Sequence, residues 1–361
     1  MTQNPYVTLA AVLDKMPNGY PSVEDGTHLR VLQWIFTPAE AELASRMKAK
    51  GETAQEIGDR LHISPEELAK RLEVMAEKGQ IRAWNSSTGR RYALLVFIGG
   101  VWENQMERGD REFAELCEDY FRKGHLRGLF DTEPPIFRVI PINRAILPQL
   151  EVYPFEVAEN MLEQAKSWGL RECACKKQKA KVGEPCKYPV SVCLNFSPKK
   201  ENAFAGDPLT RTITKDEALR ILHEAEEAGL VHCSLDAKTD HTYICNCCTC
   251  CCTMLRGAVE WGQPHAFIRS NYRSEVDREL CTGCGSCTEW CQFHALNVTD
   301  DVCTVDTSLC VGCGVCSIHC PEGALAIGQR PEAERNEPPA SYEEWMTRKI
   351  AARGVDPSSL L

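Results

Sequence analysis

Residues 281–291 read CTGCGSCTEWC and residues 310–321 read CVGCGVCSIHCP. Both stretches carry four cysteines at the spacing C-x2-C-x2-C-x3-C, with a glycine on each side of the second cysteine. Gly283, Gly285, Gly312 and Gly314 suit tight loops in which backbone N–H groups turn toward bound sulfur. The cysteines are Cys281, Cys284, Cys287 and Cys291, then Cys310, Cys313, Cys316 and Cys320. The repeat predicts two similar loops that bind metal through thiolates.

The spacing and its duplication resemble those of the bacterial two-cluster ferredoxin. The resemblance implies two [4Fe–4S] clusters, each held by three thiols of one motif and by the fourth thiol of the other. One implied ligand set is Cys281, Cys284, Cys287 and Cys320, and the other is Cys310, Cys313, Cys316 and Cys291. Pro321 completes the second motif, whereas Gln292 stands where the first motif would carry proline. The resemblance implies an electron carrier that has no open metal position.

A second concentration of thiols lies upstream, where residues 245–252 read CNCCTCCC. Four more cysteines precede it in RECACKKQKAKVGEPCKYPVSVCLNF. The ten candidate ligands are Cys173, Cys175, Cys186, Cys193, Cys245, Cys247, Cys248, Cys250, Cys251 and Cys252. Their spacings are unlike those of paired zinc ligands. Iron–sulfur ligation is the favoured interpretation, and zinc or redox-active thiols are the alternatives.

Ten thiols exceed the four that one cubane needs. In an extended segment successive side chains alternate between two faces. That alternation groups Cys248 with Cys250 and Cys252, and it leaves the other three thiols of CNCCTCCC on the opposite face. We therefore expect an additional iron–sulfur site within residues 173–252, built either as two cubanes or as one larger cluster. A helical turn would change the face assignment but would keep the surplus of thiols.

Two further cysteines, Cys117 and Cys303, are interpreted as core residues rather than ligands. Cys233 is left out of the ligand set because its stretch, GLVHCSLD, has the pattern of a helix end followed by an exposed strand. Among the basic residues, Arg171 is the one that we expect to offset the negative charge of thiolate-bound clusters. The lysines of KKQKAK (176–181) suit a solvated run of charge equally well.

Composition narrows the class of protein. The chain has 361 residues, 21 cysteines and a net charge of −10. Pro5, Asp14 and Pro17 interrupt any apolar core of a signal peptide, and no run approaches the ~18 apolar residues of a membrane helix. We expect a cytoplasmic protein without membrane segments, whose thiols bind metal. Residues 261–361 carry 8 basic and 14 acidic side chains, which suits docking to a basic patch on a redox partner protein.

The N-terminal segment has the pattern of a winged helix. Helices are expected at 37–50, 53–61 and 64–79, and a β-hairpin follows in IRAW and RRYALLVFI. The third helix carries Glu66, Glu67, Glu73 and Glu77, which would oppose DNA phosphates. We therefore interpret the segment as a docking module or as the contact of a homodimer, and we do not expect a nucleic-acid partner.

These patterns predict a modular α+β chain. The expected parts are a winged-helix-like domain with an N-terminal extension (1–98), a helical connector (99–153), a helical cysteine-rich iron–sulfur domain (154–270), a two-[4Fe–4S] ferredoxin domain (271–328) and a tail (329–361). With its PNGYPSVEDG start, RECxC, GLVH and CNCCxCCC, the whole arrangement resembles a family of large ferredoxin-like 4Fe–4S proteins from anaerobes. That resemblance brings no substrate or reaction.

Three functions are open at this point. The first is electron transfer between the two C-terminal clusters and the middle site. The second is an iron–sulfur oxidoreductase that reduces a small molecule at the middle site. The chain has no motif for an organic cofactor, so the cluster itself would have to carry out the chemistry. The third is a redox-sensing transcriptional regulator, which the acidic third helix disfavours.

Overall fold

The computed structural model describes residues 4–125, 130–150, 152–263 and 265–356. The chain divides into two compact units, and each is described by itself. One comprises residues 1–133, 177–185 and 346–361, and the other comprises residues 134–176 and 186–345. Among the described residues, no helix has both the length and the apolar character that a membrane span requires.

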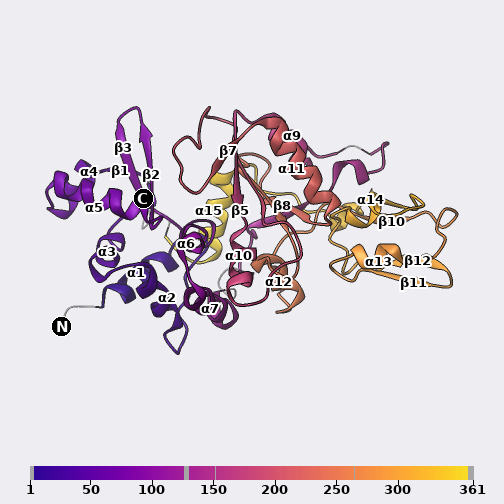
Figure 1. The fold of residues 1–361 in the computed structure, drawn as a ribbon, viewed down its shortest axis with the longest axis horizontal. Helices are drawn as coiled ribbons and strands as arrows, with labels where there is room; N and C mark the ends of the chain where they lie inside the picture. Colours follow the sequence, from indigo (N-terminus) through magenta and orange to yellow (C-terminus); the bar gives the residue numbers. More distant parts are fainter. Residues whose placement is uncertain (1–3, 126–129, 151, 264, 357–361) are drawn as a thin grey trace. The chain divides into compact units, whose positions relative to one another are not determined.

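The first unit is mainly helical and carries a small sheet (Figure 1). Its helices are α1 (Pro5–Asp14), α2 (Thr27–Ile35), α3 (Pro38–Ala44), α4 (Ala54–Leu61), α5 (Pro65–Glu77), α6 (Trp102–Arg108) and α7 (Arg111–Tyr120). Strands β1 (Glu52–Thr53), β2 (Ile81–Ser86) and β3 (Gly89–Leu94) form an antiparallel sheet in the order β1-β3-β2. Helices α10 (Ala174–Lys181) and α15 (Tyr342–Ala352) contribute residues to both units.

The three helices and the hairpin expected between residues 37 and 98 are present. Capping boxes start two of the helices, because Thr37 and Thr53 each accept from the backbone N–H three residues later. On the buried side of α5 lie Leu68, Leu72 and Met75, as the helical spacing predicts. The assignment of this segment as a winged helix remains a prediction.

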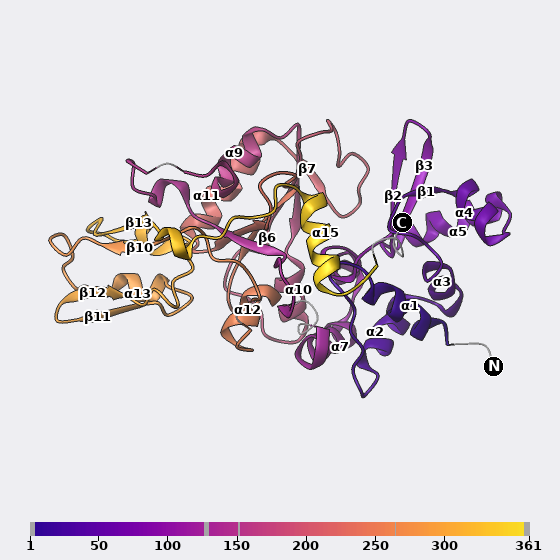
Figure 2. The ribbon, with the colours of Figure 1, turned by 180° about the vertical axis from the view of Figure 1, so that it is seen from behind.

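A six-stranded antiparallel sheet organises the second unit (Figure 2). Its strands are β4 (Phe137–Ile140), β5 (Ser167–Glu172), β6 (Ser191–Ser197), β7 (Arg211–Ile213), β8 (Val231–Leu235) and β9 (Tyr243–Cys247), in the order β4-β8-β9-β6-β5-β7. The helices of this region are α9 (Ala158–Glu163), α11 (Lys215–Glu227) and α12 (Thr253–Val259). Thr214 caps α11 by accepting from Glu217 N, and Gly229 ends it at a φ of 82°.

The cysteine-rich segment is therefore not the helical domain that we expected. Three of its ten candidate thiols, Cys193, Cys245 and Cys247, lie on strands, and the others lie in loops and turns or, for Cys175, in α10. For the strand thiols, the alternation of buried side chains is hidden in the sequence because cysteine counts as apolar. In β6, Val192, Leu194 and Phe196 are buried, and the last two join the core that packs α9 and α11 on one face of the sheet. Cys193 lies between Val192 and Leu194 in the sequence, so its side chain points to the opposite face of the sheet. Small polarizable thiols replace the polar residues that normally mark the second face of a strand.

The C-terminal part of this unit contains two short antiparallel strand pairs. Its elements are β10 (Tyr272–Val276), α13 (Ser286–Trp290), β11 (Leu296–Thr299), β12 (Val302–Val305), α14 (Val315–Ile318) and β13 (Leu325–Gln329). Strand β10 pairs with β13, and β11 pairs with β12, both antiparallel. Figure 1 shows these elements gathered at one end of the unit.

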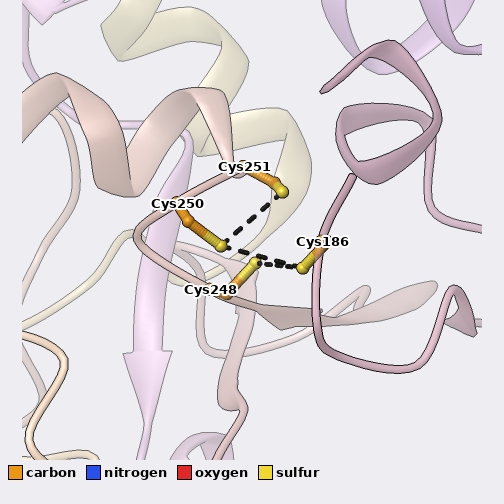
Figure 3. A group of neighbouring side chains, drawn as sticks. All are labelled: Cys186, Cys248, Cys250 and Cys251. Carbon is orange, nitrogen blue, oxygen red and sulfur yellow. Dashed lines mark hydrogen bonds between the residues drawn. The ribbon is translucent and has the colours of Figure 1, made fainter. Parts of the chain in front are cut away.

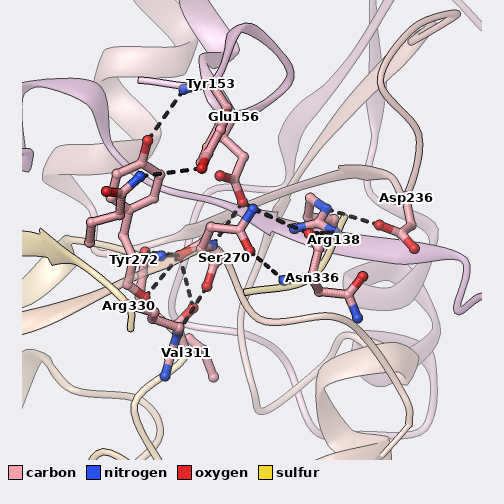
Figure 4. Close-up of polar contacts among 12 residues, drawn as sticks. Arg138, Tyr153, Glu156, Asp236, Ser270, Tyr272, Val311, Arg330 and Asn336 are labelled. Carbon is pink, nitrogen blue, oxygen red and sulfur yellow. Dashed lines mark hydrogen bonds and ion pairs between the residues drawn. The ribbon is translucent and has the colours of Figure 1, made fainter. Parts of the chain in front are cut away.

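A buried polar network joins the six-stranded sheet to this C-terminal part (Figure 4). The guanidinium of Arg138 on β4 pairs with Glu156 at 3.1 Å and with Asp236 at 2.9 Å, and all three side chains are almost fully buried. Glu156 also accepts from Asn271 N at 2.9 Å. From the other side, Arg330 donates to Ser270 O at 3.0 Å. The network fixes the backbone around residue 270, which leads directly into β10.

Candidate metal centres

One cavity of about 330 Å³ lies within the first C-terminal motif. Five thiols line it, one of them Cys303 on β12. The other four come from the loop before α13, from α13 itself and from the residues after α14. They are Cys281, Cys284, Cys287 and Cys320. These four residues are also the first ligand set that the ferredoxin resemblance implies, and they include the thiol that crosses from the second motif.

A second cavity, of about 350 Å³, lies within the other motif. Its thiols are Cys291, Cys310, Cys313 and Cys316. They match the second implied ligand set, and here Cys291 is the thiol that crosses. Four soft sulfur donors around each of two spaces fit [4Fe–4S] clusters, although the role of each thiol as a ligand remains a prediction.

The four glycines have the conformation that the loops require. Gly283, Gly285, Gly312 and Gly314 all have φ between 67° and 84°, a region that other residues rarely adopt. A Cβ atom at Gly283 would lie 2.4 Å from Asp301 O, and one at Gly312 would lie 2.1 Å from Tyr272 O. These two positions therefore need glycine for space as well as for conformation.

Backbone N–H groups donate to three of the sulfur atoms. The pairs are Cys303 N to Cys281 Sγ at 3.3 Å, Ala295 N to Cys291 Sγ at 3.3 Å, and Ser274 N to Cys310 Sγ at 3.4 Å. The hydroxyl of Ser274 also lies 3.5 Å from Cys316 Sγ. Such donors stabilise negative charge on sulfur and so influence the reduction potential of a bound cluster.

The two cavities differ in exposure. Cys284 in the first is exposed, whereas Cys310 and Cys316 in the second are buried. Burial raises the pKa of Cys316 to about 12, so this thiol is protonated at neutral pH until a metal ion displaces the proton. The first cavity is therefore the more accessible of the two from solvent.

In the middle region, the thiols of CNCCTCCC do not divide between two faces as the alternation of an extended segment predicts. Strand β9 ends at Cys247, and the chain then turns tightly, with Cys252 N donating to Cys248 O at 3.0 Å. Helix α12 starts directly afterwards, at Thr253. The turn brings Cys251, rather than Cys252, to the side of Cys248 and Cys250. The expected face assignment is wrong for these two residues, because the segment is extended only as far as Cys247.

Four thiols come together at this turn, and we call them the four-thiol group (Figure 3). They are Cys186, Cys248, Cys250 and Cys251, and their sulfur atoms all lie within 4.8 Å of one another. Cys186 Sγ is 3.6 Å from Cys248 Sγ and 3.7 Å from Cys250 Sγ. Hydrogen bonding to Cys248 and Cys251 lowers the pKa of the Cys250 thiol, so the group favours a thiolate. Clustered sulfur of this kind suits a soft metal.

The other six candidates form a second set of contacts, which we call the six-thiol group. Its thiols influence one another's pKa in the pairs Cys173–Cys175, Cys175–Cys252, Cys247–Cys252, Cys245–Cys247 and Cys193–Cys245. Cys193, Cys245 and Cys247 lie on the face of the sheet opposite α9 and α11. The ten predicted ligands thus divide into four and six, and each group combines residues from both of the original stretches.

Cys233 is a thiol that the sequence interpretation left out. It is fully buried on β8, opposite Cys245 on β9, and it raises the pKa of the Cys247 thiol. The signal was available in principle, because pairing GLVHCSL with YICNC places these cysteines on one face. Cys303 is buried as expected, but its sulfur lies 3.5 Å from Cys287 Sγ in the first cavity. Cys117 is a buried core residue whose thiol pKa is raised by burial.

Two lysines of the KKQKAK run, Lys176 and Lys179, are buried rather than solvated. Lys176, which the sequence assigned to a run of lysines that could be solvated, is 1% exposed. Its ammonium donates to Pro189 O at 2.7 Å and to Asn246 O at 3.4 Å. Asn246 lies between Cys245 and Cys247, so Lys176 holds a positive charge close to the six-thiol group. Arg171, which we expected to offset the negative charge of thiolate-bound clusters, is half-buried on β5, opposite Cys193 on β6.

Comparison with known proteins gives one match. Residues 303–326 match the Fer4 family, described as a 4Fe-4S binding domain. The matched segment contains Cys310, Cys313, Cys316 and Cys320. No curated protein and no solved structure matches the chain. The match and the cysteine groups support an iron–sulfur protein that holds at least one [4Fe–4S] cluster.

Proposed function

We propose that this chain transfers electrons between two C-terminal [4Fe–4S] clusters and a further iron–sulfur site in the middle region. The observation that carries the proposal is the pair of cavities, each lined by three thiols of one motif together with the fourth thiol of the opposite motif. When bound, the clusters would supply one-electron redox chemistry. The protein supplies the thiolates, the N–H donors and the burial that hold and tune them.

Exposure supports a direction of flow. Cys284 marks the first cavity as the place where a redox partner would exchange electrons. Around it lie exposed acidic residues, including Asp300, Asp301 and Glu322. We propose a partner with a basic docking surface, since opposite charges speed encounter. The buried second cavity would then pass electrons inward.

The middle site is proposed to consist of two parts. The four-thiol group has the number of thiolates that one [4Fe–4S] cluster needs. The six-thiol group has two more than that number, which suits a second cubane with spare thiols or a larger cluster. Cys233 adds a buried thiol beside the six-thiol group.

A reductase remains the second candidate, and one observation favours it. Cys250 is exposed although the other thiols of CNCCTCCC are buried or half-buried. A small molecule could therefore approach a metal bound at the four-thiol group. Chemistry at that position, rather than electron transfer alone, would require an iron that lacks a thiolate ligand.

The N-terminal unit is proposed to dock a protein or a second copy of the chain. Two of its basic residues are already paired, because Lys78 contacts Glu40 at 2.6 Å and Arg90 contacts Glu73 at 2.9 Å. Paired cations are poor contacts for phosphate. This pairing supports docking over the regulator that binds DNA.

The test is to add about one electron per chain from a low-potential one-electron reductant and to follow its location by freeze-quench EPR. We expect the C-terminal signals to form first and to decay as a distinct middle-site signal grows. Electrons that remain at the C-terminal sites, with the middle site loaded with iron, would contradict the proposal.

A further inference from the structure

The departure from the ferredoxin pattern at Gln292 has a structural counterpart. Gln292 follows Cys291, the thiol that crosses to the second cavity. Its side-chain oxygen accepts from Thr249 N at 2.9 Å, and its side-chain nitrogen donates to Gly229 O at 2.5 Å. Thr249 lies between Cys248 and Cys250 of the four-thiol group. One side chain therefore joins the end of the first C-terminal motif, whose Cys291 lines the second cavity, to the turn that carries the four-thiol group.

Only one orientation of the Gln292 amide satisfies both contacts. Thr249 N–H can only donate, and the Gly229 carbonyl can only accept. The amide must therefore present its oxygen to Thr249 and its nitrogen to Gly229. Proline at position 292, as the ferredoxin pattern has it, could make neither contact.

The end of α11 supports the position of Gln292. Gly229 O belongs to the residues that follow the helix, where carbonyl groups lack partners within the helix. A Cβ atom at Gly229 would lie 3.0 Å from the ring of Trp290, so glycine allows Trp290 to pack closely here. Trp290 stacks on His319 with 3.5 Å between ring centroids, and His319 Nε2 lies 3.4 Å from Glu226 O. Both C-terminal motifs thus contact the same helix end.

Resting on the proposed function, we propose that Gln292 is the positioning residue that couples the second C-terminal site to the four-thiol group. It holds Cys291 and the 248–251 turn in hydrogen-bonded contact, giving an electron a continuous path of covalent bonds and one hydrogen bond between the two sites. In that exchange one electron leaves the C-terminal site, which is oxidised, and enters the four-thiol site, which is reduced. No bond or proton changes place.

Two variants separate the contacts of Gln292. Gln292→Met keeps the length of the side chain but removes both hydrogen bonds. Gln292→Glu keeps an acceptor for Thr249 N–H and removes the donor to Gly229. With the EPR experiment above, we expect Gln292→Met to slow the growth of the middle-site signal about tenfold, with iron content unchanged. Gln292→Glu should retain most of the rate, because the Thr249 contact persists.

Hydrogen–deuterium exchange at Thr249 N–H gives a readout that is independent of electron transfer. Exchange should be faster in Gln292→Met than in the wild type, and close to the wild-type rate in Gln292→Glu. Gln263→Met, a change outside both thiol groups, serves as the control and should leave both readouts unchanged.

The outcomes distinguish the two proposals. A middle-site signal that never grows in the wild type overturns the proposed function. A wild-type signal that grows equally fast in Gln292→Met, with Thr249 exchange unchanged, overturns the role of Gln292 alone. Loss of iron from both Gln292 variants would also overturn it, because the side chain would then act in cluster binding.

Discussion

At the scale of single residues, a polar group influences a thiol of the cavities only if the fold places it next to the sulfur atom. Ser274 illustrates this, because its N–H donates to Cys310 and its hydroxyl contacts Cys316, both in the buried second cavity. Sequence spacing does not single out Ser274, since it precedes the second motif by more than thirty residues. Cys303 was placed in the core correctly, yet its contact with Cys287 depends on how the β11–β12 pair folds over the first cavity. Local spacing predicts ligands, but contacts between segments determine their neighbours.

His241 provides a test of burial in the six-stranded sheet. Burial lowers its pKa to about 4, from an ordinary value of 6.5. Ser234 donates to Tyr243 O, so His241 Nδ1 donates to Ser234 Oγ at 2.9 Å. Above about pH 7 the ring is neutral in both folded and unfolded chains, and it adds no pH dependence. As the pH falls below 6.5, the unfolded chain gains a proton that the folded chain does not, and stability declines.

We expect this residue to lower the free energy of unfolding by about 1.4 kcal/mol between roughly pH 7.5 and pH 5.5, or roughly 3–5 °C in Tm. His241→Gln should remove that part of the decline, as measured by thermal unfolding without oxygen at both pH values. His62→Asn, at an exposed site, is the control. A decline that is the same in His241→Gln and in the wild type would show that the ring is not buried and neutral.

At the scale of elements, the sequence predicts the structures that depend on neighbouring residues and misses those that depend on contacts between distant segments. The helices and the hairpin of residues 37–98, helix α11 and the β11–β12 pair all follow from local periodicity and caps. The cysteine-rich segment does not, because thiols count as apolar and hide the alternation of β6 and β9. Cys251 rather than Cys252 joins the four-thiol group because the chain turns after Cys247, and the spacing of the cysteines does not predict that turn. Cys186 joins the four-thiol group through tertiary contact alone.

The two glycines of the first motif allow a matched pair of alanine variants to be compared. Gly283 and Gly285 both have positive φ, but only at Gly283 would a Cβ atom meet backbone, 2.4 Å from Asp301 O. Gly283→Ala should displace the loop and reduce the iron content by about four per chain. Gly285→Ala should cost about 1–2 kcal/mol from its conformation and keep its iron. Equal iron loss in the two variants, measured after purification without oxygen, would argue against a tight approach at Gly283.

At the scale of the whole molecule, charge and metal content matter most. Residues 261–361 carry the acidic excess, and Asp300 and Asp301 occupy the exposed turn between β11 and β12 at φ of 52° and 57°. Asparagine tolerates that conformation, so replacing both with asparagine, together with Glu322→Gln, changes charge with little strain.

We expect the triple charge variant to accept electrons from a cationic reductant about 3- to 10-fold more slowly at low salt, and at the wild-type rate at high salt. The measurement is stopped-flow reduction at both ionic strengths. Glu66→Gln with Glu67→Gln, on α5, is the control. An equal effect with an anionic reductant would show that the change acts on the cluster rather than on encounter.

The most direct test is the content of iron and acid-labile sulfide per chain in protein purified without oxygen. We predict about sixteen irons in the wild type. Replacing Cys248, Cys250 and Cys251 with serine should remove about four of them, and replacing Cys245, Cys247 and Cys252 with serine should remove a separate share, while Cys117→Ala removes none. About eight irons in the wild type, unchanged in both serine variants, would confine the metal to the C-terminal cavities and contradict the existence of a middle iron–sulfur site.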